Sequence, residues 1–248
     1  MIDTHAHLDG CDEPARELLS RARAAGVTRV ITIGTGIESC RAALALAREH
    51  DGVYASLGID PHQAGGNEAG RVAELRELLD DPKAVAVGEA GLDYHYGGDR
   101  REEQRSLFEA QLELAGELHL PVVVHTRDAN DETEAILRSH EGTVVIHCFS
   151  EPGLLDAGLE RGWFFSFAGN VTFPKSEELR SAAVRVPAER ILAETDSPYL
   201  APQPVRGKPN EPAFVTHTIA ALAAARGEDP NRLAAQIDAN ASAAFGLP

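Results

Sequence analysis

The sequence has 248 residues, of which 43% are hydrophobic, and a formal net charge of −16 from 39 acidic and 23 basic residues. This length fits one large α/β domain or two small ones, and the composition is enough for a full core. The acidic balance argues against binding nucleic acid or an anionic membrane through bulk charge. It does not exclude a nucleic-acid enzyme, because bound divalent cations can supply local positive charge.

The cysteines and the hydropathy indicate the compartment. Cys11, Cys40 and Cys148 cannot all pair within one chain, and their scatter fits a reducing environment. The first residues show no basic segment followed by an apolar one, and no apolar run approaches a membrane span. We therefore expect a cytoplasmic protein with no membrane partner and no obligate protein partner.

Short apolar runs alternate with amphipathic stretches along the chain, which predicts strands alternating with helices. The opening run precedes a predicted helix at 13–25. The other predicted strands are residues 28–34, 53–59, 84–88, 121–125, 143–147, 163–167 and 190–194. The helices that follow them are predicted at residues 37–50, 67–79, 101–119, 129–139, 154–161, 176–186 and 213–226, with a last helix at 231–245. Residues 89–99 and the proline-rich residues 198–212 are predicted as loops.

This alternation predicts the fold. Near-continuous apolar strands separated by helices imply a parallel sheet that helices cover. Eight such units in about 250 residues favour a (β/α)8 TIM barrel over an open doubly wound sheet. Because no linker divides the sequence, we expect a single domain over residues 1–248.

Polar residues follow most of the predicted strands. They are His5 and His7, Asp60 and His62, Glu89 and Asp93, His125 and Arg127, His147, and Glu194 and Asp196. In (β/α)8 enzymes the chemistry lies at the carboxyl ends of the strands, where these side chains would converge. If these polar groups lay unpaired in the core, their burial would destabilise the fold. Together they form a nitrogen and oxygen ligand set suited to a divalent metal.

Single members of this set can also be explained without a metal. His5 and His7 alone could be a surface pair near a flexible terminus, and one strand-end histidine is more often a satisfied core residue. Several strands that end in the same way favour a metal site. No cysteine ends a predicted strand, and Cys148, next to His147, is expected to face away from the site.

The number of candidate ligands suggests two ions. The set is His5, His7, Glu89, His125, His147 and Asp196, which is more than one tetrahedral ion needs. Two adjacent ions require a bridging anion, and Glu89 is predicted as the bridge because no lysine lies at a strand end. His5, His7 and Asp196 would hold one ion, and His125 and His147 the other. A water shared by the ions would ionise near neutral pH, with Asp196 orienting it or taking its proton.

Seven short stretches carry a family resemblance. They are DTHAHLD (3–9), GIDPH (58–62), GEAGLDY (88–94), HTRDA (125–129), HCFS (147–150), ETDSP (194–198) and RGKPNEP (206–212). With them the chain resembles the TatD-family metal-dependent hydrolases of the amidohydrolase-like superfamily. The resemblance implies a deoxyribonuclease of the 3′–5′ exonuclease type that uses two divalent metal ions, Mg²⁺, Mn²⁺ or Zn²⁺. It places the family's metal ligands on the same six residues. The family usually has a histidine where this chain has Asp60, which bears on substrate recognition.

Residues around the predicted centre are candidates for substrate contacts. His62 and Arg127 are expected to contact phosphate, and Arg206 and Lys208 to reach in from the loop after the eighth strand, although a solvated loop explains the last two equally well. Tyr94, Tyr199 and Phe173 are candidates for stacking on bases, with packing as the alternative.

The acidic charge favours DNA ends or short oligonucleotides as substrate. Two other functions stay open. A sibling enzyme acting on an amide, a lactone or an aminoacyl ester would use the same centre. A non-catalytic metal-binding barrel is disfavoured by the complete ligand set.

Overall fold

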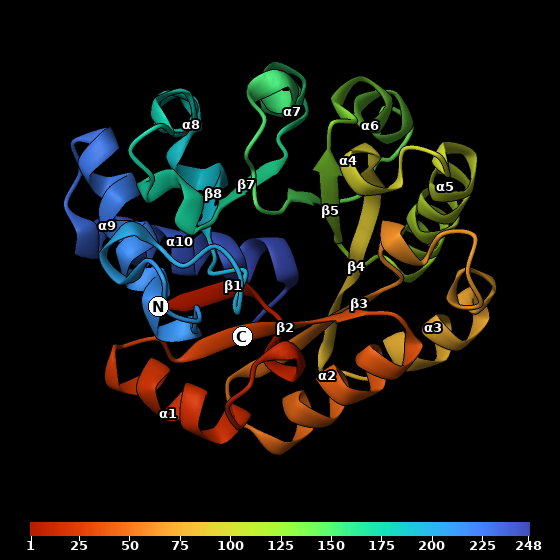
Figure 1. Ribbon diagram of the computed structural model, residues 1–248, viewed down its shortest axis with the longest axis horizontal. Coiled ribbons are helices and arrows are strands. Elements are labelled where there is room, and N and C mark those ends of the chain that lie inside the picture. Colours follow the sequence, from red (N-terminus) through yellow and green to blue (C-terminus); the bar gives the residue numbers. More distant parts are fainter.

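A computed structural model describes all 248 residues, and its eight strands form one parallel sheet in the order β1 to β8 (Figure 1). The strands are β1 (Ile2–Ala6), β2 (Arg29–Thr35), β3 (Val53–Gly58), β4 (Ala84–Asp93), β5 (Val122–Arg127), β6 (Val144–Ile146), β7 (Phe164–Phe167) and β8 (Ile191–Ala193). The predicted (β/α)8 barrel is confirmed.

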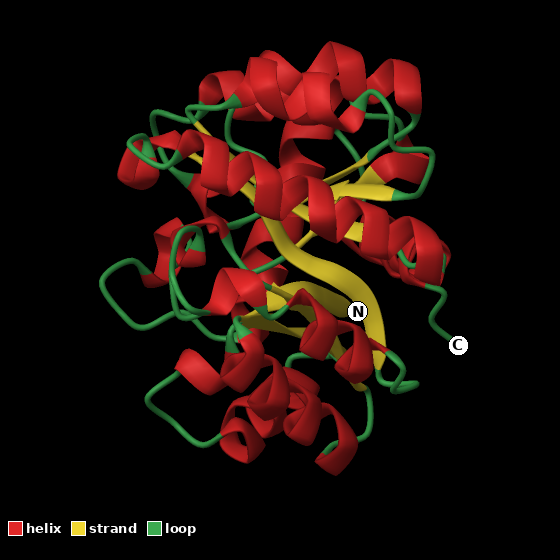
Figure 2. Cartoon of the chain, turned by 90° about the vertical axis from the view of Figure 1, so that its right-hand side faces the viewer, coloured by secondary structure: helices red, strands yellow, loops and turns green.

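Ten helices connect the strands and follow the last one. They are α1 (Ala15–Ala24), α2 (Ile37–Glu49), α3 (Val72–Leu79), α4 (Tyr94–Gly97), α5 (Arg101–Leu118), α6 (Asn130–Leu137), α7 (Leu155–Arg161), α8 (Glu177–Arg185), α9 (Val215–Arg226) and α10 (Pro230–Phe245). Figure 2 shows them outside the strands. Each longer helix turns one apolar stripe inward, and one hydrophobic cluster of 68 buried residues joins strands and helices. None of the helices is long and apolar enough to cross a membrane.

The barrel closes at a narrow seam between its first and last strands. β1 meets the segment after β8 through one isolated parallel bridge, Ala6 with Ser197. The His7 N–H donates to the Ser197 carbonyl at 2.8 Å, and the Asp196 N–H donates to the His5 carbonyl at 2.9 Å. These two hydrogen bonds set His5, His7 and Asp196 side by side.

The prediction of a loop at residues 89–99 is wrong. β4 continues to Asp93 and pairs with β5, with Gly91 opposite His125, and α4 follows directly. The glycines required by this pairing caused the error, because glycine and acidic residues together usually indicate a loop. Gly91 has φ +147, and a Cβ there would lie 1.9 Å from the His125 carbonyl oxygen. The longer strand carries Glu89 inside the barrel wall, where all of β4 is buried.

Candidate metal centre

The six predicted ligands lie together at the carboxyl end of the barrel. His5 is on β1 and His7 follows it, Glu89 is in β4, His125 is in β5, His147 follows β6, and Asp196 follows β8. All except His5 line a cavity of about 610 Å³, and His5 is fully buried beneath it. The structure therefore brings residues from five parts of the chain to one site.

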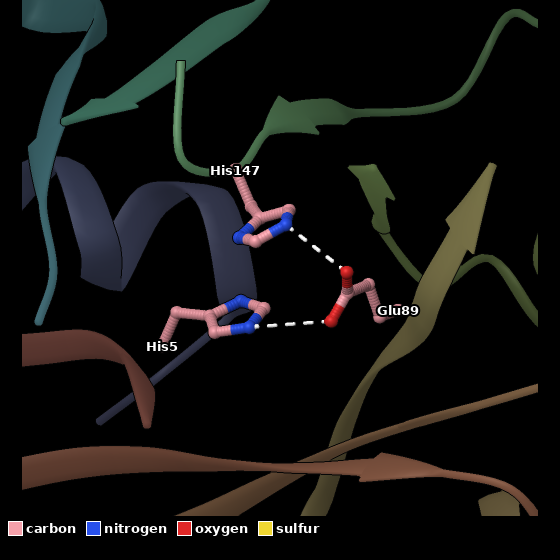
Figure 3. Close-up of side chains that lie close together, drawn as sticks. All are labelled: His5, Glu89 and His147. Carbon is pink, nitrogen blue, oxygen red and sulfur yellow. Dashed lines mark ion pairs between the residues drawn. The ribbon is translucent and has the colours of Figure 1, made fainter. Parts of the chain in front are cut away.

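Glu89 occupies the middle of this site and uses its two oxygens in different directions. Glu89 Oε1 lies 2.7 Å from His125 Nδ1 and 3.1 Å from His147 Nε2. Glu89 Oε2 lies 3.5 Å from His5 Nε2 and 3.8 Å from His7 Nε2. Figure 3 shows His147 and His5 each facing a separate oxygen of Glu89. One carboxylate thus joins two pairs of imidazoles.

Asp196 completes the half of the site that contains His5 and His7. Asp196 Oδ1 lies 3.3 Å from His7 Nε2 and 3.8 Å from His5 Nε2. The two Nε2 atoms are themselves 3.3 Å apart. Ligand atoms of His5, His7 and Asp196 therefore converge within 4.8 Å of one another, as do those of His5, Glu89 and His147.

Burial and mutual pairing set the charges at the site. Burial alone would raise the pKa of the Glu89 carboxyl, but His147, His125 and His5 hold that pKa well below its usual range. Burial likewise opposes ionisation of Asp196, and its pKa is nevertheless lowered by His7 and His5. Two buried carboxylates thus stay ionised in a nitrogen-lined pocket.

The donor set fits divalent cations. Four imidazole nitrogens and two ionised carboxylates form an N/O set of borderline hardness, with no thiolate within it. Each of these imidazole nitrogens lies 2.7 to 3.8 Å from more than one other ligand atom. Hydrogen bonds between fixed pairs do not explain this arrangement. A cation that accepts lone pairs from every side satisfies all of these atoms at once.

Two more carboxylates lie behind the histidines. Glu194 Oε1 lies 3.2 Å from His147 Nδ1 and accepts the Cys148 N–H at 2.8 Å. Asp93 Oδ2 lies 3.2 Å from His125 Nε2. By accepting one ring N–H, such a carboxylate fixes the tautomer and leaves the other nitrogen free to ligate. The sequence placed both carboxylates at strand ends but gave no sign of this supporting position, because the rings they contact come from other strands.

The predicted substrate contacts divide into two groups. His62 and Arg127 line the cavity, with His62 Nε2 3.7 Å from Asp93 Oδ2. Arg206 is not among the lining residues, and its guanidinium lies 3.9 Å over the ring of Phe173. Arg206 therefore reaches only the surface outside the cavity.

Other residues near the cavity also depart from expectation. Asp60 lines the cavity, and burial raises its pKa to about 6. Tyr199 lines it too, whereas Tyr94 packs away from it with its hydroxyl 2.7 Å from Glu132. The expectation for Cys148 is wrong. With φ 45 it leaves the strand conformation, so the alternation of faces stops and Cys148 lines the cavity.

Known proteins share this sequence and architecture. The chain matches the family described as TatD related DNase over residues 2–246. It is 37% identical to the uncharacterized metal-dependent hydrolase TatD of Mycobacterium tuberculosis, a match that covers 100% of this chain and 98% of the relative. It is 38% identical to the 3′-5′ ssDNA/RNA exonuclease TatD of Klebsiella pneumoniae, covering 93% of this chain and 91% of that protein.

A solved structure agrees with these relatives. The crystal structure of YjjV, a TatD homologue from Escherichia coli K12, superposes with a TM-score of 0.94 at 31% sequence identity. The match covers 100% of this chain and 98% of that one.

Proposed function

Because the chain belongs to the TatD-related DNase family of metal-dependent hydrolases, we propose that it is a 3′–5′ exonuclease that releases nucleotides from DNA ends. The name of the Klebsiella pneumoniae relative supports a single-stranded nucleic-acid substrate. The −16 net charge supports a short contact with the substrate rather than a long duplex footprint. The unit that carries this activity is one domain over residues 1–248.

The observation that carries the proposal is the orientation of Glu89, whose two oxygens face separate histidine pairs. We assign one divalent ion to His5, His7 and Asp196, and a second to His125 and His147, with Glu89 between them. Four imidazoles and two carboxylates suit Zn²⁺, Mn²⁺ or Mg²⁺. When bound, such a pair supplies positive charge for the phosphate and lowers the pKa of water.

The surrounding residues then have distinct roles. Asp196 turns Oδ1 to the histidines, and its second oxygen is assigned to accepting a proton from the attacking water, which its ionised state permits. His62 and Arg127 are assigned to non-bridging oxygens of the phosphate, because both line the cavity beside the ligands. Arg206, outside the cavity, is assigned to a phosphate further along the strand.

Strand-end cleavage can be tested with end-labelled DNA. We expect a linear single strand to lose mononucleotides from its 3′ end in the presence of Mg²⁺, Mn²⁺ or Zn²⁺, and a covalently closed single-stranded circle to stay intact. Equal cleavage of the circle would contradict an exonuclease, and earlier release of a 5′ label would contradict the polarity. Hydrolysis of lactones or amides without any phosphodiester cleavage would favour the sibling activity.

Glu89→Gln tests the bridge directly. The amide keeps the shape of the carboxylate but removes its charge, so we expect metal content to fall from two ions to one. Turnover should fall by on the order of a thousandfold. Glu160→Gln, an exposed residue on α7, is the matched control and should retain both ions and full activity. Unchanged metal content in Glu89→Gln would refute the bridging role.

A further inference from the structure

Two exposed tyrosines stand at the rim of the proposed catalytic cavity. Only three large hydrophobic side chains of the protein are exposed: Tyr96 at 69%, Val184 at 54% and Tyr199 at 59%. Both tyrosines line the cavity, whereas Val184 lies on α8 away from it. An exposed aromatic ring beside a site offers a face on which the base of a nucleic-acid ligand can stack.

The two tyrosines lie on opposite sides of the barrel mouth. Tyr96 follows β4 and Tyr199 follows β8, so three strands lie between them in either direction around the barrel. The Tyr199 ring lies 5.8 Å from the His7 ring. The Tyr96 ring lies 6.2 Å from that of His62, which lies 6.1 Å from the His125 ring. Each tyrosine therefore borders a different half of the ligand set.

The backbone of each tyrosine is fixed to the site. The Tyr96 N–H donates to Asp93 Oδ1 at 2.8 Å, and the other oxygen of Asp93 contacts His125. The Tyr199 N–H donates to the Asp196 carbonyl at 2.8 Å, and its own carbonyl accepts from the buried Asn210 amide at 2.6 Å. Exposed rings on fixed backbones lose little conformational freedom when a ligand stacks on them.

The chemistry around Tyr96 points to a nucleotide. The Arg127 guanidinium lies 4.8 Å from the centre of the Tyr96 ring, which leaves a cation beside an aromatic surface. A base stacks on a ring of this kind whatever its identity, and the adjacent guanidinium suits the phosphate. Tyr199 offers a second ring across the cavity.

We propose that Tyr96 and Tyr199 stack on the two bases that flank the scissile phosphate, so that cleavage requires unpaired and separated nucleotides. This inference rests on the proposed function. Bases in a duplex remain stacked on their neighbours and cannot turn to opposite sides of the cavity. The two rings thus select single-stranded ends.

Substrates that lack one base distinguish the role of Tyr96 from that of Tyr199. The substrate is a short oligonucleotide whose cleaved linkage carries both bases, an abasic tetrahydrofuran unit on the 5′ side, one on the 3′ side, or one on each. Removing either base should lower kcat/KM of the wild type by about tenfold or more. On the substrate that carries both bases, Tyr96→Ala should lower kcat/KM by a similar factor. On the substrate that lacks the base stacked on Tyr96, the variant and the wild type should have the same kcat/KM. Tyr199→Ala should behave in the same way toward the opposite base.

Three controls accompany these variants. Tyr96→Phe and Tyr199→Phe should recover the kcat/KM that the alanine variants lose, because stacking needs the ring and not the hydroxyl. Val184→Ala removes the other exposed apolar side chain and should change nothing. The doubly abasic substrate should be cleaved equally by all variants, since it tests the metal centre alone. Equal losses on that substrate, or indifference of the wild type to the bases, would overturn the stacking role.

A binding measurement keeps the inference testable even without hydrolysis. If the wild type cleaves no phosphodiester, the proposed function fails. Stacking is then read from the fluorescence of 2-aminopurine placed on either side of the linkage, with metal-loaded protein. Quenching relieved at one position by Tyr96→Ala and at the other by Tyr199→Ala supports the inference, and unrelieved quenching refutes it.

Discussion

His125 is the proposed ligand whose protonation should govern metal binding. Burial lowers the pKa of its imidazole, but Asp93 and Glu89, at 3.2 and 2.7 Å from its two nitrogens, outweigh burial and raise the pKa to about 9. In the metal-free protein this ring therefore keeps its extra proton at neutral pH. Metal and proton compete for the nitrogen, because only the unprotonated form ligates.

We therefore expect the apparent metal affinity to rise with pH. Between about pH 6.5 and the raised pKa of about 9, the affinity should increase up to about tenfold per pH unit for each displaced proton, then level off. Competition with a chelator of known affinity measures this slope. Asp93→Asn removes one cause of the raised pKa and should move the plateau to lower pH. A flat profile over this range would contradict the prediction.

At the scale of single residues, the sequence allowed the convergence of the six candidate ligands to be predicted, but not the side chains that surround them. Alternation of polar and apolar positions places His5 and His7 on one face, and chain order places Asp196 beside them. The position of Glu194 behind His147 depends on where two rings meet across the barrel. Arg206 lies in a proline-rich stretch without periodicity, so nothing in the sequence indicates that it stacks on Phe173.

At the scale of the elements, β4 has no room for a side chain at Gly91. A Cβ at Gly91 would lie 1.9 Å from the His125 carbonyl oxygen, with φ +147, whereas one at Gly116 on the exposed side of α5 meets no atom within 4 Å. Gly91→Ala should therefore lower the free energy of unfolding by on the order of 2–4 kcal/mol through strain and lost pairing. Gly116→Ala, the matched control, should raise it by about 0.5–1 kcal/mol, because alanine favours the helix.

Urea denaturation of both glycine variants measures these changes. The midpoints should move in opposite directions relative to the wild type. Equal stability of Gly91→Ala and the wild type would mean that β4 can separate from β5 without cost, contrary to the pairing of Gly91 with His125.

Sequence patterns located nearly every element, because most strands are rich in apolar residues and most of the longer helices are amphipathic. The ends of the helices and strands were harder to predict from the sequence. The helix predicted at 67–79 begins only at Val72, after a separate short turn. The carboxyl half of β4 was missed, since glycines demanded by a neighbouring strand resemble those of a loop. Such a requirement is visible only when both strands are in place.

Across the whole molecule, the proposed ions connect parts of the barrel that the backbone joins weakly. Ligands from β1 and from the segment after β8 lie on either side of the seam, where Ala6 and Ser197 form the only bridge. Removal of metal should therefore destabilise the fold. At a metal concentration about a thousandfold above Kd, binding contributes about 4 kcal/mol, which corresponds to a shift of on the order of 10 °C in Tm.

Thermal unfolding before and after chelation measures this contribution. We expect Tm to fall on chelation and to recover when the metal is restored. Hydrogen exchange should quicken at the His7 and Asp196 amides, whose bonds close the seam. An unchanged Tm in protein shown to be free of metal would contradict a structural contribution of the ions.

The overall barrel was predictable because eight repeated units leave few other topologies. Its closure followed from the same count, but the narrowness of the seam did not, since short-range patterns give no measure of how many hydrogen bonds join the first and last strands.

The seam also has a consequence for the protein while it is being synthesised. His5 and His7 leave the ribosome long before their partner Asp196, because seven of the eight strands, β2 to β8, are translated between them. A fragment released before that point lacks a ligand of the first proposed ion and the backbone groups of Asp196 and Ser197 that close the seam. Under the proposed function, an interrupted translation product is therefore unable to degrade DNA, and activity is restricted to chains that extend past the seam residues Asp196 and Ser197.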